Sequence, residues 1–329
     1  MKSLEEDELC FPHLLNSSCK KTMRPHFESL LTYILLSSIS LLTVTLNLLV
    51  IISISHFRQL HTPTNLLLVS LAVSDFFVGL IVFFQIMLLD GCWFLGDLMC
   101  IFYTFLLYII TCASVGDMVL ISVDRYVAIC EPLHYANKVT QKRVKICVCL
   151  CWTCSAFLLT LLLEDHLKEP GRNNSCFGEC VIVINYIAGL ADLFFTFIGP
   201  VTVIIVLYMR VFVVAVTQAR AMRSHAAVLP LKFSLTITAK KSEVKAARTL
   251  GVVIVVFLMC ICPYYCVSLS GQDTFLNVSS ATIVIFVFYF NSCLNPLIYA
   301  FFYPWFRKSM KLIVTLKILQ PGSCEQNLL

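Results

Sequence analysis

The sequence predicts an all-α integral membrane protein, folded as a bundle of seven transmembrane helices. Of its 329 residues, 59% are apolar and 13% are charged, against roughly 45–50% and roughly 25% in a soluble domain. One water-soluble core cannot hide this much apolar surface. The apolar segments are long and lack the period-2 alternation of a transmembrane barrel, so helices are expected to span the bilayer. A soluble globular enzyme is excluded.

Seven segments have the length that a membrane-spanning helix needs. In chain order, stretches without Lys, Arg, Asp or Glu cover 29–57, 59–74, 76–89, 101–116, 146–163, 193–209, 249–272 and 274–306. The second and third stretches join across the lone Asp75, and the third and fifth spans extend across Asp117 and Asp192. Each segment then meets the requirement of about 20 apolar residues to cross a hydrocarbon core about 30 Å thick.

The distribution of basic residues orients the bundle. With the N-terminus outside, the extracellular parts hold only Lys2, Lys20, Lys21, Arg24, Lys168 and Arg172, and the other 18 of the 24 Lys and Arg residues face the cytoplasm. This bias favours an outer N-terminus and an inner C-terminus. Residues 1–28 are then an extracellular segment, 29–303 the transmembrane domain, and 304–329 a short amphipathic eighth helix and a cytoplasmic tail. The outer side holds 12 of the 19 acids, and such a face concentrates cations.

Six of the 17 cysteines fall in the predicted extracellular parts, namely Cys10, Cys19, Cys92, Cys100, Cys176 and Cys180. An even number in an oxidising compartment indicates three disulfides, for which six cysteines allow 15 pairings. Glycosylation sequons begin at Asn16, Asn173 and Asn277 on the same side.

The chain carries no catalytic constellation and no pair of metal-ligand spacing inside a span, so we expect no enzyme activity. A membrane transport protein is a competing class, but it would need polar residues along several spans and broken helices at mid-membrane. Neither pattern is present, and the odd number of spans also argues against a transporter.

Each predicted span contains one short motif. In order these are Asn47, Leu71-Ala-Val-Ser-Asp75, Asp124-Arg125-Tyr126, Trp152, Pro200, Phe257-x-x-Cys260-x-x-Pro263 and Asn295-Pro-x-x-Tyr299. Together they resemble the motifs of the rhodopsin-like G-protein-coupled receptors. Within that superfamily, the chain is similar to the trace amine-associated receptors over nearly its whole length. The similarity is carried by His56-Phe-Arg-Gln-Leu-His-Thr-Pro-Thr-Asn65, Lys245-Ala-Ala-Arg-Thr-Leu-Gly251, Tyr299-Ala-Phe-Phe-Tyr-Pro-Trp-Phe-Arg-Lys308, Leu9-Cys10…Asn16-Ser-Ser-Cys19 and Cys176-Phe-Gly-Glu-Cys180.

The resemblance implies a plasma-membrane receptor, olfactory in most members of the family, that binds a volatile amine and signals through a stimulatory G protein and cAMP. It implies a G-protein coupling site made of Asp124, Arg125, Tyr126, Tyr208, Glu243 and Tyr299, with an ionic contact between Arg125 and Glu243 at rest. It also implies a sodium ion at Asp75 and Ser114, near Asn291 and Ser292, and no other cofactor. The expected partners are a small amine, a heterotrimeric G protein and membrane lipid along the basic stretch 217–248, but no nucleic acid.

The resemblance further implies which outer cysteines pair. Cys100 is expected to bond to Cys180. Cys10 is expected to bond to Cys176 and Cys19 to Cys92, with Cys10 and Cys19 open to exchange.

The expected ligand site departs from the family pattern in span three. Amine receptors of this family usually have Asp 18 residues before the Arg of Asp-Arg-Tyr, and here that position is Leu107. Span five instead contains Asp192, eight residues or about 12 Å above Pro200. An intramembrane acid is a site hypothesis by default, and a bound ammonium would offset the cost of its desolvation. The non-standard, teleost-expanded branch of the family shows the same exchange.

Asp192 is therefore the expected amine anchor. The alternatives are that it faces lipid headgroups or pairs with an outer base such as Arg172, in which case the receptor binds a non-amine ligand. The rest of the expected ligand site is Leu107, Tyr108, Thr111, Tyr264, Tyr265 and Tyr289, with Phe286 as a further aromatic candidate. Asp117 is interpreted as structural. Ile261 replaces the usual tryptophan two residues before Pro263, so the rotamer-switch account of activation does not carry over.

Overall fold

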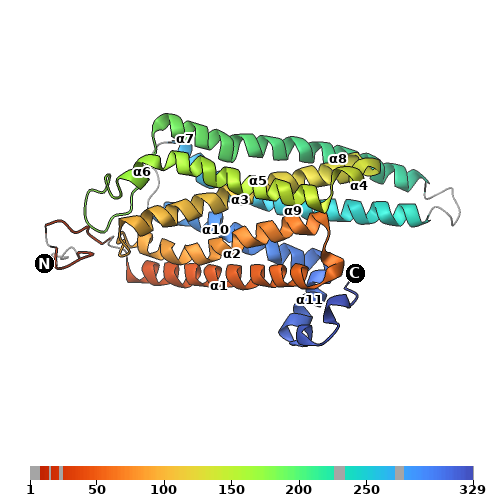
Figure 1. Ribbon diagram of the computed structural model, residues 1–329, viewed down its shortest axis with the longest axis horizontal. Coiled ribbons are helices and arrows are strands. Elements are labelled where there is room, and N and C mark those ends of the chain that lie inside the picture. The colour runs from red at the N-terminus through yellow and green to blue at the C-terminus, as the bar shows by residue number, and fades with distance from the viewer. Residues whose placement is uncertain (1–7, 15, 22–24, 226–233, 271–277, 329) are drawn as a thin grey trace.

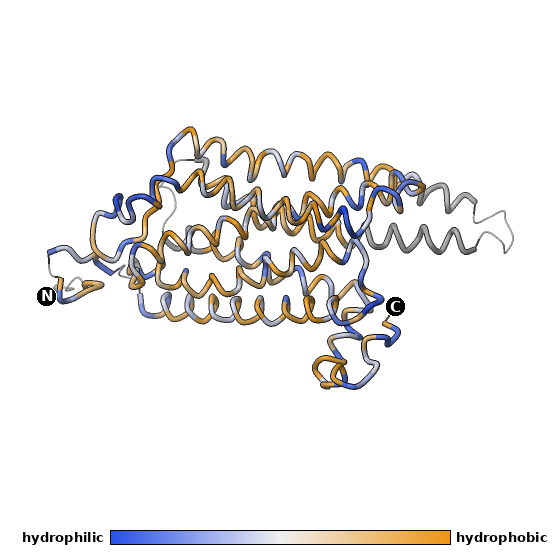
Figure 2. The backbone as a smooth tube through the Cα atoms, viewed as in Figure 1, coloured by the Kyte–Doolittle hydropathy of each residue, from blue (hydrophilic) through white to orange (hydrophobic). Residues whose placement is uncertain are grey.

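The computed structural model describes the backbone of residues 8–14, 16–21, 25–225, 234–270 and 278–328, and the side chains of these residues outside 218–248 and 268–282. In these parts of the chain, seven helices are long and apolar enough to cross a membrane. They lie side by side along the longest axis of the molecule (Figure 1). Apolar residues follow their length and hydrophilic residues gather at the two ends (Figure 2). The predicted seven-helix bundle is confirmed.

The spans follow the predicted order. Their bounds are α1 His26–His56, α2 Pro63–Leu89, α3 Asp97–Cys130, α5 Gln141–Leu162, α7 Tyr186–Leu193 continued by η3 Phe194–Ile198 and α8 Gly199–His225, α9 Ser234–Ser270, and α10 Val278–Phe302. The short helices are η1 Arg58–Leu60, η2 Pro132–His134, α4 Tyr135–Lys138, α6 Glu164–Lys168, α11 Pro304–Val314, η5 Lys317–Leu319 and η6 Ser323–Glu325. Helix α11 turns away from the bundle, at the end opposite to the N-terminal segment (Figure 1). It buries Trp305 and Phe306 at the position of the expected eighth helix.

Two helix starts have a physical cause that is visible in the sequence. The hydroxyl of Thr62 accepts a hydrogen bond from the backbone N–H of Asn65 at the start of α2, where Pro63 takes the first helical position. The hydroxyl of Thr140 accepts from the N–H of Arg143 at the start of α5. Side-chain oxygens of this kind satisfy backbone donors that the first turn leaves free, and proline costs nothing there.

The helices pack into a closed bundle around α3. Helix α1 packs on α2 and α10, α2 on α3, α3 on α8 and α5, and α9 on α10. Two apolar clusters fill the interior, one around Phe57, Phe257 and Tyr299 and the other around Trp93 and Tyr289. The second cluster lies toward the end that carries the disulfides, and its residue Tyr289 also lines the candidate cavity described below.

Span five departs from regular α-helix immediately after Asp192. Residues Phe194–Ile198 form a π-helical turn, in which the N–H of Gly199 donates to the carbonyl of Phe194 five residues earlier. Pro200 lacks an N–H and its ring excludes the regular bond to the turn before it, and π-turns of this kind recur at functional sites. The regular α-helical rise that we assumed between Asp192 and Pro200 therefore does not hold, because the wide turn changes both the depth and the direction of the residues above it.

Three disulfides tie the N-terminal segment and the loop before α7 to the tops of α2 and α3. The pair Cys100 with Cys180 is present as predicted. The other two pairs are Cys10 with Cys92 and Cys19 with Cys176, so the predicted assignment was wrong and the exchanged one holds.

The path of residues 9–20 explains the exchange. The segment folds back on itself, so the N–H of Cys10 donates to the carbonyl of Cys19 at 2.9 Å. Its returning arm runs along the loop, where the N–H of Cys19 donates to the carbonyl of Phe177 at 3.0 Å. Cys19 is thereby placed beside Cys176, while the sulfur of Cys10 lies 3.6 Å from the carbonyl oxygen of Gly91, next to Cys92.

Candidate ligand-binding site

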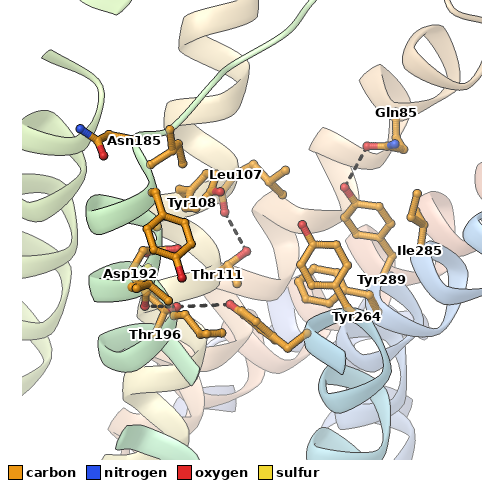
Figure 3. A pocket seen from close by; sticks show the side chains of 18 residues that line it. Gln85, Leu107, Tyr108, Thr111, Asn185, Asp192, Thr196, Tyr264, Ile285 and Tyr289 are labelled. Atoms are coloured by element: carbon orange, nitrogen blue, oxygen red, sulfur yellow. Dashed lines mark hydrogen bonds between the residues drawn. The ribbon is translucent and has the colours of Figure 1, made fainter. Parts of the chain in front are cut away.

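A cavity of about 670 Å³ lies among α2, α3, α7, α9 and α10 (Figure 3). This volume is within the usual range for small-molecule sites. The cavity brings together every residue expected in the ligand site, namely Leu107, Tyr108, Thr111, Asp192, Tyr264, Tyr265 and Tyr289. Phe286 does not line it and packs in the apolar cluster around Trp93. Asp117 is fully buried and also lies outside the lining.

Asp192 is half-buried on the α7 wall of the cavity. Its backbone carbonyl accepts a hydrogen bond from the Thr196 hydroxyl at 2.7 Å, and among the described residues no basic side chain pairs with its carboxylate. The alternative partner, Arg172, forms an exposed ion pair with Glu169 at 3.3 Å instead. The Asp192 carboxylate thus lies in an apolar span without a partner cation in the described part of the chain.

Aromatic rings stand close to this carboxylate. Tyr108, Tyr264 and Tyr265 line the same cavity as Asp192. The ring of Tyr265 stacks on Phe197 with centroids 4.2 Å apart, and its hydroxyl lies 3.4 Å from the Thr196 hydroxyl. A bound ammonium would therefore meet both a carboxylate and the faces or edges of rings that packing holds in place.

The α3 wall offers no charge. Leu107 lines the cavity, and the hydroxyl of Thr111 donates to the backbone carbonyl of Leu107 at 2.8 Å. That bond satisfies the hydroxyl hydrogen within the helix, as is common for threonine in helices. The α3 position at which the sequence resemblance led us to look for an acid is therefore apolar in the structure as well.

Sequence analysis missed Gln85 on α2, which lines the cavity opposite the α7 wall (Figure 3). Its amide oxygen accepts hydrogen bonds from the hydroxyls of Tyr289 at 3.1 Å and Tyr103 at 2.8 Å. The available signal was a single amide inside the otherwise apolar stretch 76–89. Thr196 and Asn185, which caps α7 by accepting from the N–H of Ile187, also line the cavity and were missed.

A second polar cluster lies at the other end of α3. Nε of Arg125 donates to Asp124 at 2.9 Å, and the guanidinium also donates to the Thr64 hydroxyl at 2.8 Å. The Asp124 carboxylate further accepts from the hydroxyls of Thr64 and Tyr135. Burial and then the Asp124 charge raise the pKa of Tyr135 to about 12, so its hydroxyl remains a donor at neutral pH.

The structure describes the remaining residues of the expected coupling site only in part. Tyr126 is half-buried near the end of α3. The hydroxyls of Tyr208 and Tyr299 are buried and have no hydrogen-bond partner in the described part of the chain. The side chain of Glu243, the expected partner of Arg125, lies outside the described residues. The partners that the structure gives to the Asp124–Arg125 pair, Thr64 and Tyr135, were not foreseen.

Asp75 lies fully buried between the two ends. One carboxylate oxygen accepts from Nδ2 of Asn295 at 2.8 Å, while its other oxygen and the side-chain oxygens of Asn291 and Asn295 have no partner among the described residues. A cavity of about 30 Å³ lined by Ser114, Asn291 and Ser292 lies nearby, large enough for a water molecule or a small ion. Oxygen donors of this kind suit a hard cation, so the residues fit a sodium ion.

The expected glycosylation sites are only partly described. Asn16 and Asn173 are exposed, as glycan attachment requires. Asn277 lies outside the described residues.

In the described part of the chain, seven helices long and apolar enough to span a membrane, a cavity among them and a buried Asp-Arg pair at the opposite end indicate a transmembrane receptor. Residues 46–299 match the family model described as 7 transmembrane receptor (rhodopsin family). The chain is 36% identical to trace amine-associated receptor 13c of Danio rerio, over 98% of this chain and 97% of the relative. It is 38% identical to trace amine-associated receptor 9 of Rattus norvegicus, over 98% and 97%.

The chain therefore belongs to the trace amine-associated receptors of the rhodopsin family. Members of this family are receptors rather than enzymes. The chain is a multi-pass plasma-membrane protein that binds a ligand and couples to a G protein.

Proposed function

We propose that the chain is an olfactory receptor for small amines, that Asp192 anchors the ammonium, and that the receptor signals through a stimulatory G protein and cAMP. The observation that carries the proposal is the carboxylate of Asp192 on the wall of a 670 Å³ cavity, with no basic partner among the described residues. The two relatives named above are both trace amine-associated receptors, which supports an amine as the ligand.

The physical argument rests on the cost of an unpaired charge. A carboxylate inside an apolar span is expensive unless a cation or several donors accompany it. An alkylammonium supplies both a positive charge and N–H donors, and a charge-assisted hydrogen bond of this kind is stronger than a neutral one. The nearby rings of Tyr108, Tyr264 and Tyr265 add cation–π attraction of about 0.5–2 kcal/mol each.

The far end of α3 is the proposed site of G-protein coupling. Arg125 is held there by Asp124 and Thr64, and ligand binding is proposed to release it toward the G protein. A sodium ion held by Asp75, Ser114 and the unpartnered amide oxygens of Asn291 and Asn295 is proposed to stabilise the resting state between the two sites.

The test is a cAMP assay in cells that express the full chain, run against a panel of amines, alcohols and carboxylic acids. We expect amines to activate the parent and Asp192→Asn, which keeps size and hydrogen bonding but removes the charge, to lose the response at equal surface expression. The apolar Leu107 wall favours one other candidate, a receptor for a non-amine ligand. Activation by alcohols or acids alone would establish that alternative, and an unchanged amine response in Asp192→Asn would show that the ammonium anchor lies elsewhere.

A further inference from the structure

The candidate cavity has a second polar end, where the polar group is an uncharged amide. Gln85 on α2 faces it from the side opposite Asp192 (Figure 3). Between the two ends lie the apolar Leu107 and the hydroxyl-bearing Thr111 and Tyr264 (Figure 3). A molecule that spans the cavity would thus meet a carboxylate at one end, uncharged side chains in the middle and an amide at the other end.

The amide oxygen of Gln85 is fully hydrogen-bonded, whereas its amide nitrogen has no acceptor among the described residues. An amide oxygen has two lone pairs, and both are occupied by the hydroxyls of Tyr103 and Tyr289. The amide nitrogen has two N–H donors, and neither has an acceptor among the described residues. A donor that a bound ligand shields from water costs free energy unless the ligand supplies an acceptor, so the cavity presents an amide N–H that a ligand acceptor can satisfy.

The amide is also held in a fixed position. Tyr103 is 6% exposed and Tyr289 is 4% exposed. The ring of Tyr103 packs against Trp93 with centroids 5.5 Å apart. Tyr103 does not line the cavity, so it contacts Gln85 from behind and orients it. A donor positioned in advance by buried neighbours favours binding because little freedom is lost.

The charges of the lining side chains determine which class of ligand group can bind at the Gln85 end of the cavity. Among the described lining residues, Asp192 is the one acidic side chain and no basic side chain is present. A second ammonium at Gln85 would meet N–H donors and no carboxylate, and a carboxylate there would be buried without a cation. Both are costly in a low-dielectric site. A neutral oxygen acceptor carries no such cost.

We propose that Gln85 is a specificity-determining residue, and that the ligand is an amine with a neutral oxygen acceptor, such as a hydroxyl, ether or carbonyl oxygen, at the end remote from its ammonium. The oxygen accepts a hydrogen bond from the Gln85 amide, and Tyr103 acts as a positioning residue that holds this amide. The inference rests on the proposed function, because it takes Asp192 as the anchor of the ammonium.

The experiment compares ligands of equal length in the cAMP assay on the full chain. The series contains alkylamines and the corresponding ω-amino alcohols, ω-amino methyl ethers, α,ω-diamines and ω-amino acids. At the best chain length we expect the parent to respond to the amino alcohol and the amino ether at about tenfold lower concentration than to the alkylamine, which corresponds to about 1.4 kcal/mol. The diamine and the amino acid are expected to be weaker than both.

Variants of Gln85 and Tyr103, with a matched control, separate an effect on ligand specificity from an effect on folding. Gln85→Leu is expected to remove the tenfold advantage at equal surface expression, and Tyr103→Phe to reduce the advantage in the same direction. Gln85→Glu is expected to turn the preference toward the diamine, because it adds a carboxylate at this end. The matched control is Gln59→Leu, the same substitution at a glutamine whose side chain bonds Glu325 in the C-terminal tail, and it is expected to leave the ranking unaltered.

The outcomes distinguish this inference from the proposed function on which it rests. If Asp192→Asn removes the amine responses but Gln85→Leu lowers alkylamine and amino ether equally, the anchor stands and the inference is wrong. A parent that ranks alkylamine and amino ether alike also overturns it, as does an advantage confined to the alcohol, since an ether can only accept. A parent that no amine activates overturns the proposed function and the inference together.

Discussion

The hydroxyl of Tyr289 on α10 donates a hydrogen bond to the amide oxygen of Gln85 on α2 at 3.1 Å. These residues are far apart in the chain, and their contact closes one side of the candidate cavity. The side chain of Leu107 on the α3 wall has no hydrogen-bond acceptor, and the phenol of Tyr289 donates to the Gln85 amide. Spans two and seven are thus joined by a polar contact, while Asp192 is the one acidic side chain among the described lining residues.

The disulfide pattern leads to a first prediction. We expect mass mapping of the unreduced protein to recover Cys10 with Cys92, Cys19 with Cys176 and Cys100 with Cys180. Cys100→Ser is expected to lower surface expression strongly, because loss of a native disulfide costs about 2–5 kcal/mol in small secreted domains. Peptides that join Cys10 to Cys176 would contradict the fold-back path of residues 9–20, and free thiols at Cys100 or Cys180 would refute the third pair.

Arg125→Ala should abolish the cAMP response while ligand binding and surface expression remain mostly intact. The physical reason is distance, because Arg125 lies 18 residues along α3 from Leu107, which is about 27 Å of helix. Surface labelling and ligand binding on the same cells provide the control. Lost binding with preserved G-protein activation would show that this end of α3 does not have the proposed role.

The proposed sodium site predicts that agonist potency depends on external sodium. Replacing external choline by sodium is expected to weaken agonist potency on the order of fivefold or more, as is usual for coupled sites, because the ion would stabilise the resting state. Asp75→Asn removes the charge that holds the ion while keeping an oxygen near Asn295, so the sodium effect should vanish. The same sodium effect in Asp75→Asn and in the parent would place the ion elsewhere.

The membrane spans were predictable because the length of an apolar segment is a local property of the sequence. Asp192 was predictable for the same reason, since a lone acid in an apolar stretch is visible without knowledge of its neighbours. The cavity confirms that Leu107, Tyr108 and Tyr289 share one site with it.

Contacts between distant segments were not predictable from local pattern. The role of Gln85 is visible only in the fold, which brings Tyr103 and Tyr289 to its amide oxygen. The pairing of Cys10 was misassigned because it depends on how the N-terminal segment folds back, which no spacing of cysteines records. The π-helical turn after Asp192 was missed because it is a local response to Pro200 and tertiary packing that periodicity does not show.

The last prediction concerns the number of cationic centres that the ligand carries. With Leu107 on α3 and Asp192 on α7, one carboxylate is available among the described lining residues, so a diamine would leave its second ammonium unpaired at a cost of several kcal/mol. Leu107→Asp should therefore add an anchor on the α3 wall and widen the response toward diamines, measured as a fall in the concentration of diamine that gives half-maximal cAMP. Asp192→Glu keeps the charge and should retain far more of the amine response than Asp192→Asn does. If Leu107→Asp gains no diamine response at normal surface expression, the ligand does not lie between these two walls and the pose anchored on Asp192 is wrong.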